Sequence, residues 1–326
     1  MKRRHLLATL PAAAAALHGL PRALAADTGK VLRVGFQKGG LLLQVKARGV
    51  LEQRLAPLGW QVRWLEFPAG PQLLEAFNVN AIDIGTTGAP PPIFAQAAGT
   101  DFVYFAAEPG QPHSEAIIVK PESPLRSLAD LKDRRIGLQK GSSSHYLLLA
   151  ALGKAGLGWA DVQPVFLAPA DARAAFERGA IDAWVVWDPY LTFAQAATKS
   201  RVLVDFSAFA PVAPPWSFYE ARKAFAAEQP ALLRDHVVPV LAEAGAWANA
   251  NPQAAAKLLA PLFGMDEALL LQLQQRVRFG ARLLNDTIAA DQQRVADAFA
   301  SQRLIPKPIR VREAWAPVLY PAATKA

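Results

Sequence analysis

The chain has 326 residues, of which 52% are hydrophobic and 19% are charged, and this composition is typical of a globular protein with room for two domains. It has no cysteine, which excludes a disulfide framework, thiolate metal sites and a cysteine nucleophile. The formal net charge is +8, and without the four basic residues among the first 25, which resemble a secretion signal, it is (35 − 4) − 27 = +4. This mild basic excess has no basic stripe, so it favours small anions over nucleic acid as partners.

Residues 1–25 have the pattern of a cleavable secretion signal. Lys2, Arg3 and Arg4 precede a broken apolar stretch, and residues 23–25 read Ala-Leu-Ala, which is typical of a cleavage site. The arginine pair is compatible with twin-arginine export as well as with the general route. Because the chain has no cysteine for lipid attachment, we expect the exported protein to be retained in a periplasm.

Two sequence words recur farther along the chain at nearly equal spacing. RVGFQKG at residues 33–39 returns as RIGLQKG at residues 135–141, and AFNVNAID at residues 76–83 returns as AFERGAID at residues 175–182. Each copy reads as a strand, a glycine turn and a helix, followed by a second helix and a second strand. This repetition predicts two similar α/β lobes with parallel strands.

The remaining segments can be assigned to these lobes. Further strands are expected at residues 61–67, 102–106, 115–119, 164–167 and 201–205. After Trp216 the pattern becomes helical, most clearly at residues 230–249, 252–262 and 291–300. Because these helices bring no strand of their own, we assign them to the first lobe, which then comprises residues 26–115 and 215–326. The second lobe comprises residues 116–214, and the two crossings between the lobes form a hinge.

Three loops rich in small residues follow expected strands. They are the turn Gln37, Lys38, Gly39 and Gly40; the run Thr86, Thr87 and Gly88; and Gly141 with Ser142, Ser143 and Ser144. Open α/β sheets bind ligands at such strand ends, where helix N-termini point free N–H groups into a crevice. The triple serine is the sharpest signal, although a single serine there would be an ordinary helix N-cap. The loops predict a small-anion site between the lobes.

Four further residues are candidates because of their position. Trp187 and Asp188 follow the repeated strand of the second lobe, where an indole can form one wall of a cleft, whereas Trp184 is expected in the core. Glu108 and Trp216 lie near the two crossings. Each of these two residues either faces the ligand or braces the hinge.

Signatures of catalysis and of cofactor binding are missing from the sequence. His145 joins the candidate ligand contacts as the neighbour of Ser144, but adjacent helical residues point apart, which argues against a catalytic pair. There is no G-x-S-x-G elbow and no glycine-rich phosphate loop. His113, His145 and His236 show no metal-ligand spacing. We therefore expect no catalytic residue, no cofactor and no metal.

Longer words in the same loops carry a resemblance to a known family. They are GFQKG at 35–39, EFPAGPQLLEA at 66–76, PPIFAQAAG at 91–99, QKGSSSH at 139–145, PADARAAF at 169–176 and WDPY at 187–190. With these words the chain resembles the periplasmic aliphatic sulfonate-binding proteins of ABC import systems, relatives of taurine- and nitrate-type binding proteins. The resemblance implies a two-lobed type II periplasmic binding fold, delivery to an inner-membrane ABC permease, and a sulfonate between the lobes. It places ligand contacts at Gln37, Thr86, Thr87, Ser142, Ser143 and Trp187.

The chain departs from related sequences at two places. Ala89 stands where related chains often have an acidic residue, and Gly40 and Leu41 stand where they have a hydroxyl. These departures favour a sulfonate ligand with an alkyl tail over one with an ammonium tail. We expect a monomer that binds an alkanesulfonate. The alternatives are an enzyme on the same bilobal fold, or a binder of another small anion or of a thiamine precursor.

Overall fold

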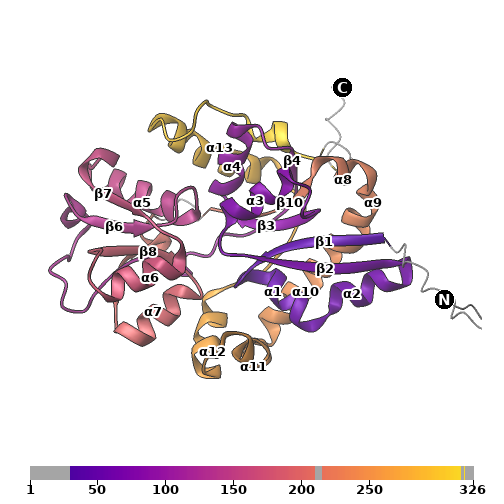
Figure 1. The fold of residues 1–326 in the computed structure, drawn as a ribbon, viewed down its shortest axis with the longest axis horizontal. Coiled ribbons are helices and arrows are strands. Elements are labelled where there is room, and N and C mark those ends of the chain that lie inside the picture. Colours follow the sequence, from indigo (N-terminus) through magenta and orange to yellow (C-terminus); the bar gives the residue numbers. More distant parts are fainter. Residues whose placement is uncertain (1–29, 210–214, 317–318, 320–326) are drawn as a thin grey trace, which may run out of the picture.

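The computed structural model describes residues 30–209, 215–316 and 319, and the predicted secretion signal at residues 1–25 lies outside them. The described chain folds into two five-stranded sheets that lie side by side, each with helices on both faces (Figure 1). No helix in the described part combines the length and the apolar character needed to cross a membrane.

The first sheet has the strand order β2-β1-β3-β10-β4. Its strands are β1 (Lys30–Gln37), β2 (Trp60–Phe67), β3 (Ile84–Gly88), β4 (Phe102–Glu108) and β10 (Ser217–Arg222). Strand β1 is parallel to β2 and β3, and β10 is antiparallel to β3 and β4. Because β10 follows the whole second sheet in sequence, the chain crosses between the sheets twice.

The second sheet has the order β7-β6-β8-β5-β9 and repeats the arrangement of the first. Its strands are β5 (Glu115–Val119), β6 (Arg135–Leu138), β7 (Gln163–Phe166), β8 (Ala183–Trp187) and β9 (Arg201–Asp205). Strands β6, β7 and β8 are parallel and correspond to β1, β2 and β3, while antiparallel β5 corresponds to β10. The two similar α/β lobes predicted from the repeated words are thereby confirmed.

An ion pair explains why the same words occur in both lobes. In the first lobe the Arg33 guanidinium donates to Asp83 Oδ1 at 2.6 Å, and the Arg33 backbone N–H donates to Asp83 Oδ2 at 2.9 Å. In the second lobe Arg135 makes the same two bonds to Asp182, both at 2.8 Å. Each pair joins the residue just before the central strand, β3 or β8, to the neighbouring parallel strand, β1 or β6.

Helices form the outer layers of both sheets. They are α1 (Gly40–Arg48), α2 (Val50–Leu55), α3 (Gly70–Asn78), α4 (Pro90–Ala98), α5 (Ser143–Lys154), α6 (Pro169–Glu177), α7 (Tyr190–Thr198), α8 (Lys223–Glu228), α9 (Pro230–Leu232), α10 (Val238–Ala250), α11 (Pro252–Phe263), α12 (Glu267–Arg276) and α13 (Asp286–Ser301). Short turns are η1 (Ala56–Leu58), η2 (Leu128–Leu131), η3 (Trp159–Asp161), η4 (Phe206–Phe209), the π-helical η5 (Leu233–Val237) and η6 (Val311–Ala314).

The C-terminal helices pack on the first sheet, as expected, but they also contact the second lobe. Helix α10 packs on α1 and α2, and α13 packs on α4. In addition α12 contacts α7, and α13 contacts α5 (Figure 1). The chain passes from the first sheet to the second between β4 and β5, which begins at Glu115, and it returns between β9 and β10. Both crossings lie near the predicted positions. The domain boundaries themselves stay a prediction.

Candidate functional site

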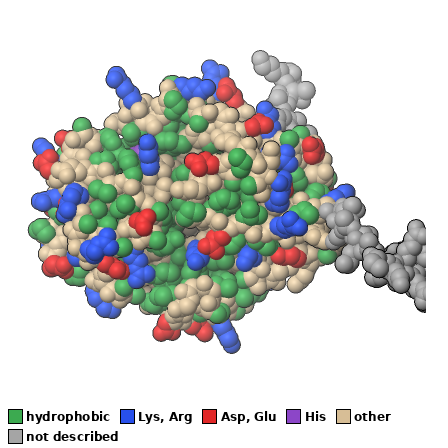
Figure 2. All heavy atoms as spheres, in the orientation of Figure 1, with side chains coloured by type: hydrophobic (Ala, Val, Ile, Leu, Met, Phe, Trp, Pro, Cys, Tyr) green, Lys and Arg blue, Asp and Glu red, His purple; other side chains and the backbone are tan. Residues whose placement is uncertain are grey.

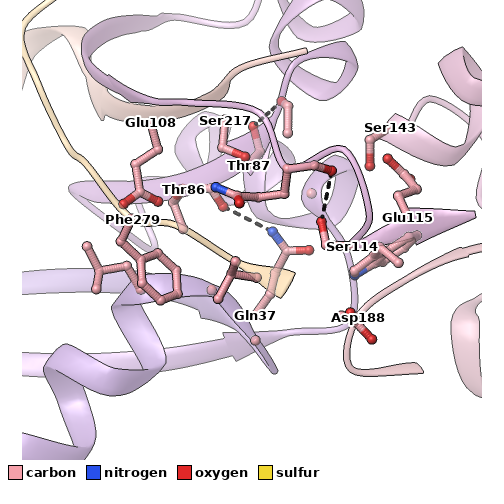
Figure 3. Close-up of a pocket in the computed structure, with 18 of the residues that line it drawn as sticks. Gln37, Thr86, Thr87, Glu108, Ser114, Glu115, Ser143, Asp188, Ser217 and Phe279 are labelled. Carbon is pink, nitrogen blue, oxygen red and sulfur yellow. Dashed lines mark hydrogen bonds between the residues drawn. The ribbon is translucent and has the colours of Figure 1, made fainter. Parts of the chain in front are cut away.

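A cavity of about 200 Å³ lies between the two sheets and suits a small ligand. Both lobes line it, mainly through the carboxyl ends of β1, β3, β4 and β8 with their following loops, the start of β5, and the loop after β6. Figure 3 shows side chains from both lobes around the cavity. Eleven of the thirteen predicted ligand-binding residues lie in its wall. They are Gln37, Gly39, Thr86, Thr87, Gly88, Glu108, Ser142, Ser143, Trp187, Asp188 and Trp216.

Thr86 and Thr87, near the end of β3, donate their hydroxyl protons to other groups of the protein. Thr86 Oγ1 donates to the Phe218 carbonyl at 2.9 Å, and Thr87 Oγ1 donates to Glu220 Oε1 at 2.6 Å. Gln37 Nε2 donates to the Thr86 carbonyl at 3.0 Å, which ties the β1 loop to the β3 loop (Figure 3). These side chains are held in fixed positions before any ligand arrives.

The two helices that begin at the cavity differ in their donors. Helix α4 starts with three prolines, residues 90–92, and proline has no backbone N–H, so this N-terminus has few donors for an anion. Helix α5 starts with Ser143, Ser144 and His145, and its first free N–H groups carry the partial positive charge of the helix dipole. Of the two helix N-termini at the cavity, α5 therefore offers the more backbone N–H donors.

Ser142 and Ser143 take different roles at the start of α5. Ser142 stands at the N-cap position without a side-chain cap bond, and its Oγ donates instead to the Gln139 carbonyl at 2.8 Å. Ser143 faces the cavity wall opposite Gly88, where a Cβ added to Gly88 would lie 3.3 Å from Ser143 Cβ. A glycine at position 88 thus lets the β3 loop approach α5 closely.

Ser144 and His145, which were predicted as ligand contacts, do not line the cavity. Each helical step turns a side chain by about 100°, and both side chains are completely buried behind Ser143. Ser144 Oγ donates to Glu115 Oε1 at 2.9 Å. The His145 ring packs among the aromatic side chains of Phe94, Trp159, Phe166 and Phe299. Burial lowers the pKa of His145 to about 4, which keeps the ring neutral.

Two buried carboxyl groups face the cavity. Glu108 is at the end of β4 and Glu115 at the start of β5, and their residues are only 7% and 6% exposed. Burial raises the pKa of both carboxyls to about 7. The Tyr219 hydroxyl and the Gly280 N–H oppose the rise at Glu108, and the serine hydroxyls at the start of α5 oppose it at Glu115.

Asp188 lines the cavity but its carboxylate is already bonded. Oδ1 accepts from Thr192 N at 3.0 Å and from Thr192 Oγ1 at 2.6 Å, and Oδ2 lies 3.4 Å from Arg276 Nη1. Burial raises the pKa of Asp188, and Thr192 and the Arg276 charge oppose that rise. These contacts indicate that Asp188 connects α7 to α12 rather than serving as a free acceptor for a ligand.

The two tryptophans form walls of the cavity as predicted. Trp216 Nε1 donates to Asp291 Oδ2 at 2.8 Å, so its indole N–H is not free for a ligand. Trp187 packs edge-to-face against Tyr190. Trp184 is 1% exposed and belongs to the core, as expected.

The sequence reasoning missed the part of the wall that comes from the C-terminal helices. This part is mostly apolar and consists of Leu259, Phe263, Leu273, Gln274, Val277 and Phe279. The helical periodicity of these segments was readable, but periodicity does not tell which helix face meets a cavity in a distant part of the chain. Ser114 and Glu115 were also missed, because they lie just before and at the first residue of an expected strand, whereas the candidates were sought at strand ends.

Charged side chains are spread over the surface and are not gathered at one place. Figure 2 shows lysine, arginine and acidic side chains interspersed over the face in view, without a continuous basic patch. Within residues 30–209 and 215–316, no group of three or more histidine, aspartate or glutamate side chains is arranged to hold a metal ion.

Comparison with known proteins identifies the family. Residues 61–255 match the family described as NMT1/THI5 like. A relative from Escherichia coli K12, described as an aliphatic sulfonates-binding protein, is 42% identical over 299 residues, covering 90% of this chain and 92% of the relative. The chain belongs to this family.

Two solved structures have a fold similar to that of this chain. The periplasmic aliphatic sulphonate binding protein SsuA from Escherichia coli has a TM-score of 0.78 and 41% identity, covering 88% of this chain and 92% of that one. The alkanesulfonate-binding protein SsuA from Xanthomonas axonopodis pv. citri, bound to MOPS, has a TM-score of 0.83 and 38% identity, covering 87% and 97%. The resemblance and the two-lobed α/β fold are confirmed. These relatives are named as binding proteins and not as enzymes.

Proposed function

We propose that this chain is the periplasmic solute-binding protein of an ABC importer and captures an aliphatic sulfonate between its lobes. The observation that carries the proposal is the N-terminus of α5, where Ser143 and free backbone N–H groups open into a cavity enclosed by both lobes. The sulfonate-binding relatives, which match along most of their length, support the same ligand class.

The chemistry of the cavity suits a sulfonate headgroup. A sulfonate has three oxygens that only accept hydrogen bonds, and a helix N-terminus with a hydroxyl supplies donors without bringing a full charge. Each hydrogen bond to a charged group contributes about 1.5–3 kcal/mol. Three or four such bonds, reduced by the entropy of association, correspond to a micromolar complex.

Competition calorimetry tests the headgroup. Butanesulfonate, butanephosphonate and pentanoate share a similar tail and differ in charge, geometry and protonation. We expect butanesulfonate to bind about ten- to a hundredfold more tightly than the phosphonate, because the second negative charge of a phosphonate has no cation at α5 and lies beside the Glu115 carboxyl, a mismatch that costs about 1–3 kcal/mol. Recovery of unchanged ligand by mass spectrometry is expected as well. Tighter binding of pentanoate, or conversion of the ligand, contradicts the proposal.

The setting of the protein is part of the same proposal. Residues 1–25 direct export, the mature chain acts as a monomer in the periplasm, and the closed liganded form is the one that an inner-membrane permease receives. Osmotic-shock fractionation and light scattering of the purified protein test these points. Retention in the cytoplasmic fraction, or a stable dimer, contradicts them.

A further inference from the structure

Glu108 presents an unpaired carboxyl oxygen inside the cavity. It ends β4 and lies opposite Ser217 of β10, its residue is 7% exposed, and its Oε1 has no hydrogen-bond partner among the described residues. No lysine or arginine in the described part of the chain forms an ion pair with it. A buried acceptor of this kind is unfavourable unless a ligand or water supplies a donor.

The cavity has two chemically different ends. In the view of Figure 3, Glu108 lies beside Phe279 at one end, Ser143 and Glu115 lie at the other, and Thr86 lies between them. The α5 end donates hydrogen bonds, as a sulfonate requires. The Glu108 end accepts them, and it borders the apolar wall of the C-terminal helices.

The charges around the cavity favour a ligand that is not purely anionic. Lys38 is the one basic side chain among the described lining residues, whereas Glu108, Glu115 and Asp188 are acidic. Lys38 is half-exposed and lies 3.5 Å from Glu66, so it is partly neutralised at the rim. A simple alkanesulfonate satisfies only the donor end and leaves Glu108 Oε1 without a hydrogen-bond partner.

We propose that Glu108 is the specificity-determining acceptor for an ammonium group at the far end of the ligand, so that the preferred ligand is an aminoalkanesulfonate. This inference rests on the proposed sulfonate site and names its substrate class. It replaces the expectation from Gly40 and Leu41 that an alkyl tail is preferred. The headgroup binds at α5, and the tail crosses the cavity to Glu108.

A matched pair of ligands tests this assignment. 3-Aminopropanesulfonate and butanesulfonate have the same number of non-hydrogen atoms and differ in one terminal group, ammonium against methyl. At pH 8 the ammonium is protonated and Glu108 is mainly ionised, because burial raises its pKa only to about 7. Calorimetry of the wild-type protein should give at least about tenfold tighter binding of the amino ligand, or about 1.4 kcal/mol.

Variants locate the effect at Glu108. In Glu108→Gln the preference for the amino ligand should fall to about onefold or reverse, while butanesulfonate still binds. Glu243→Gln removes one carboxylate from exposed α10, outside the cavity, and should keep the wild-type ratio. Thermal melting checks that each variant folds. If Glu108→Gln does not fold, the wild-type ratio alone decides the question.

The outcomes separate this inference from the proposed function. Equal binding of both ligands by the wild type overturns the role of Glu108 and leaves the sulfonate site standing. Loss of the preference in Glu115→Gln, with the preference kept in Glu108→Gln, places the ammonium at the wrong end and also overturns it. Failure of both ligands to bind refutes the sulfonate function together with this inference.

Discussion

At the level of single residues, the site divides donors from acceptors. Ser143 stands at the start of α5 in the cavity wall, whereas the Ser142 hydroxyl already donates to the Gln139 carbonyl. The two neighbouring serines therefore differ in what they offer a ligand. Ser142 shapes the loop, and Ser143 is free to change its hydrogen-bond partner.

Ser143→Ala should weaken sulfonate binding by about tenfold, because one charge-assisted hydrogen bond contributes about 1.5–3 kcal/mol. Isothermal titration calorimetry with butanesulfonate measures the change. Ser301→Ala, at the exposed C-terminal end of α13, is the matched control and should leave the affinity unchanged. An unaltered affinity in folded Ser143→Ala would mean that backbone N–H groups alone hold the headgroup.

Alkanesulfonate binding should weaken as the pH rises from 6 to 8. Burial raises the pKa of Glu115 to about 7, so above this pH its carboxylate is ionised, draws the hydroxyl protons of Ser143 and Ser144, and repels an anion at α5. Below pH 7 the carboxyl is neutral and this repulsion is absent. Calorimetry with butanesulfonate across this range measures the slope.

Glu115→Gln should reduce the change of butanesulfonate affinity with pH. We assign the pH dependence that remains to Glu108, because burial also raises its pKa to about 7. Other ionisable groups on the elements around Glu115 are His145 on α5, Asp188 after β8 and Asp205 on β9, which lies 2.9 Å from His113. His145, with a pKa of about 4, stays neutral throughout the range. A slope unchanged by Glu115→Gln would assign the pH dependence to one of the other groups.

The residues of the three loops were predictable because strand ends and helix starts can be read locally. Ser144 and His145 lie outside the cavity wall, which the sequence could not show because the same local pattern does not fix which side of α5 faces the cavity. Phe279 and Val277 were not predictable, since their place in the wall depends on how the C-terminal helices pack between the lobes.

At the level of elements, the repeated arginine–aspartate pair offers a comparison between two nearly identical arrangements. Asp83 has a side chain 2% exposed and also lies 3.2 Å from Arg222, whereas Asp182 is 31% exposed and pairs with Arg135 alone. Hydrogen bonds from the arginine partner lower the pKa of each aspartate against the effect of burial. The same interaction therefore exists once in the interior and once near solvent.

Asp83→Asn should lower the free energy of unfolding by about 3 kcal/mol, because it leaves Arg33 and Arg222 without their buried partner. Asp182→Asn should cost less than about 1 kcal/mol, as is usual for exposed pairs. Urea unfolding of both variants at pH 7 measures the difference. Equal decreases in the free energy of unfolding would show that burial does not make the Asp83 pair more stabilising than the Asp182 pair.

At the level of the whole molecule, the lobes meet at several points around the cavity. Gly39 has a φ of +129°, and a Cβ there would lie 3.2 Å from Pro189 Cδ on the second lobe. The His145 ring of α5 lies 5.1 Å from that of Phe299 on α13. The repeat predicted two lobes, but it gave no sign that α12 and α13 would bridge them, because these helices have no counterpart in the second lobe.

Arg276 is the polar part of this bridge. From the end of α12 its guanidinium lies 3.4 Å from Asp188 Oδ2, 3.3 Å from Thr192 Oγ1 and 3.1 Å from Gln195 Oε1, all on the second lobe. Its side chain is 26% exposed and that of Asp188 is 4% exposed. Breaking the contact removes a charge partner from a buried carboxylate and should favour separation of the lobes.

Arg276→Gln should therefore open the ligand-free protein and weaken ligand binding by about threefold to tenfold. A ligand that needs the closed form binds in proportion to the fraction of molecules that are closed, so a smaller closed fraction raises the apparent Kd. Small-angle scattering should give a larger radius of gyration for the ligand-free variant than for the wild type, and equal radii once butanesulfonate is saturating. Arg54→Gln, whose exposed pair with Glu243 lies away from the cavity, is the control and should match the wild type in both states. If ligand-free Arg276→Gln scatters like the wild type and binds with unchanged affinity, the apolar contacts at Gly39 and Phe299 hold the lobes together without help from the α12 ion pair.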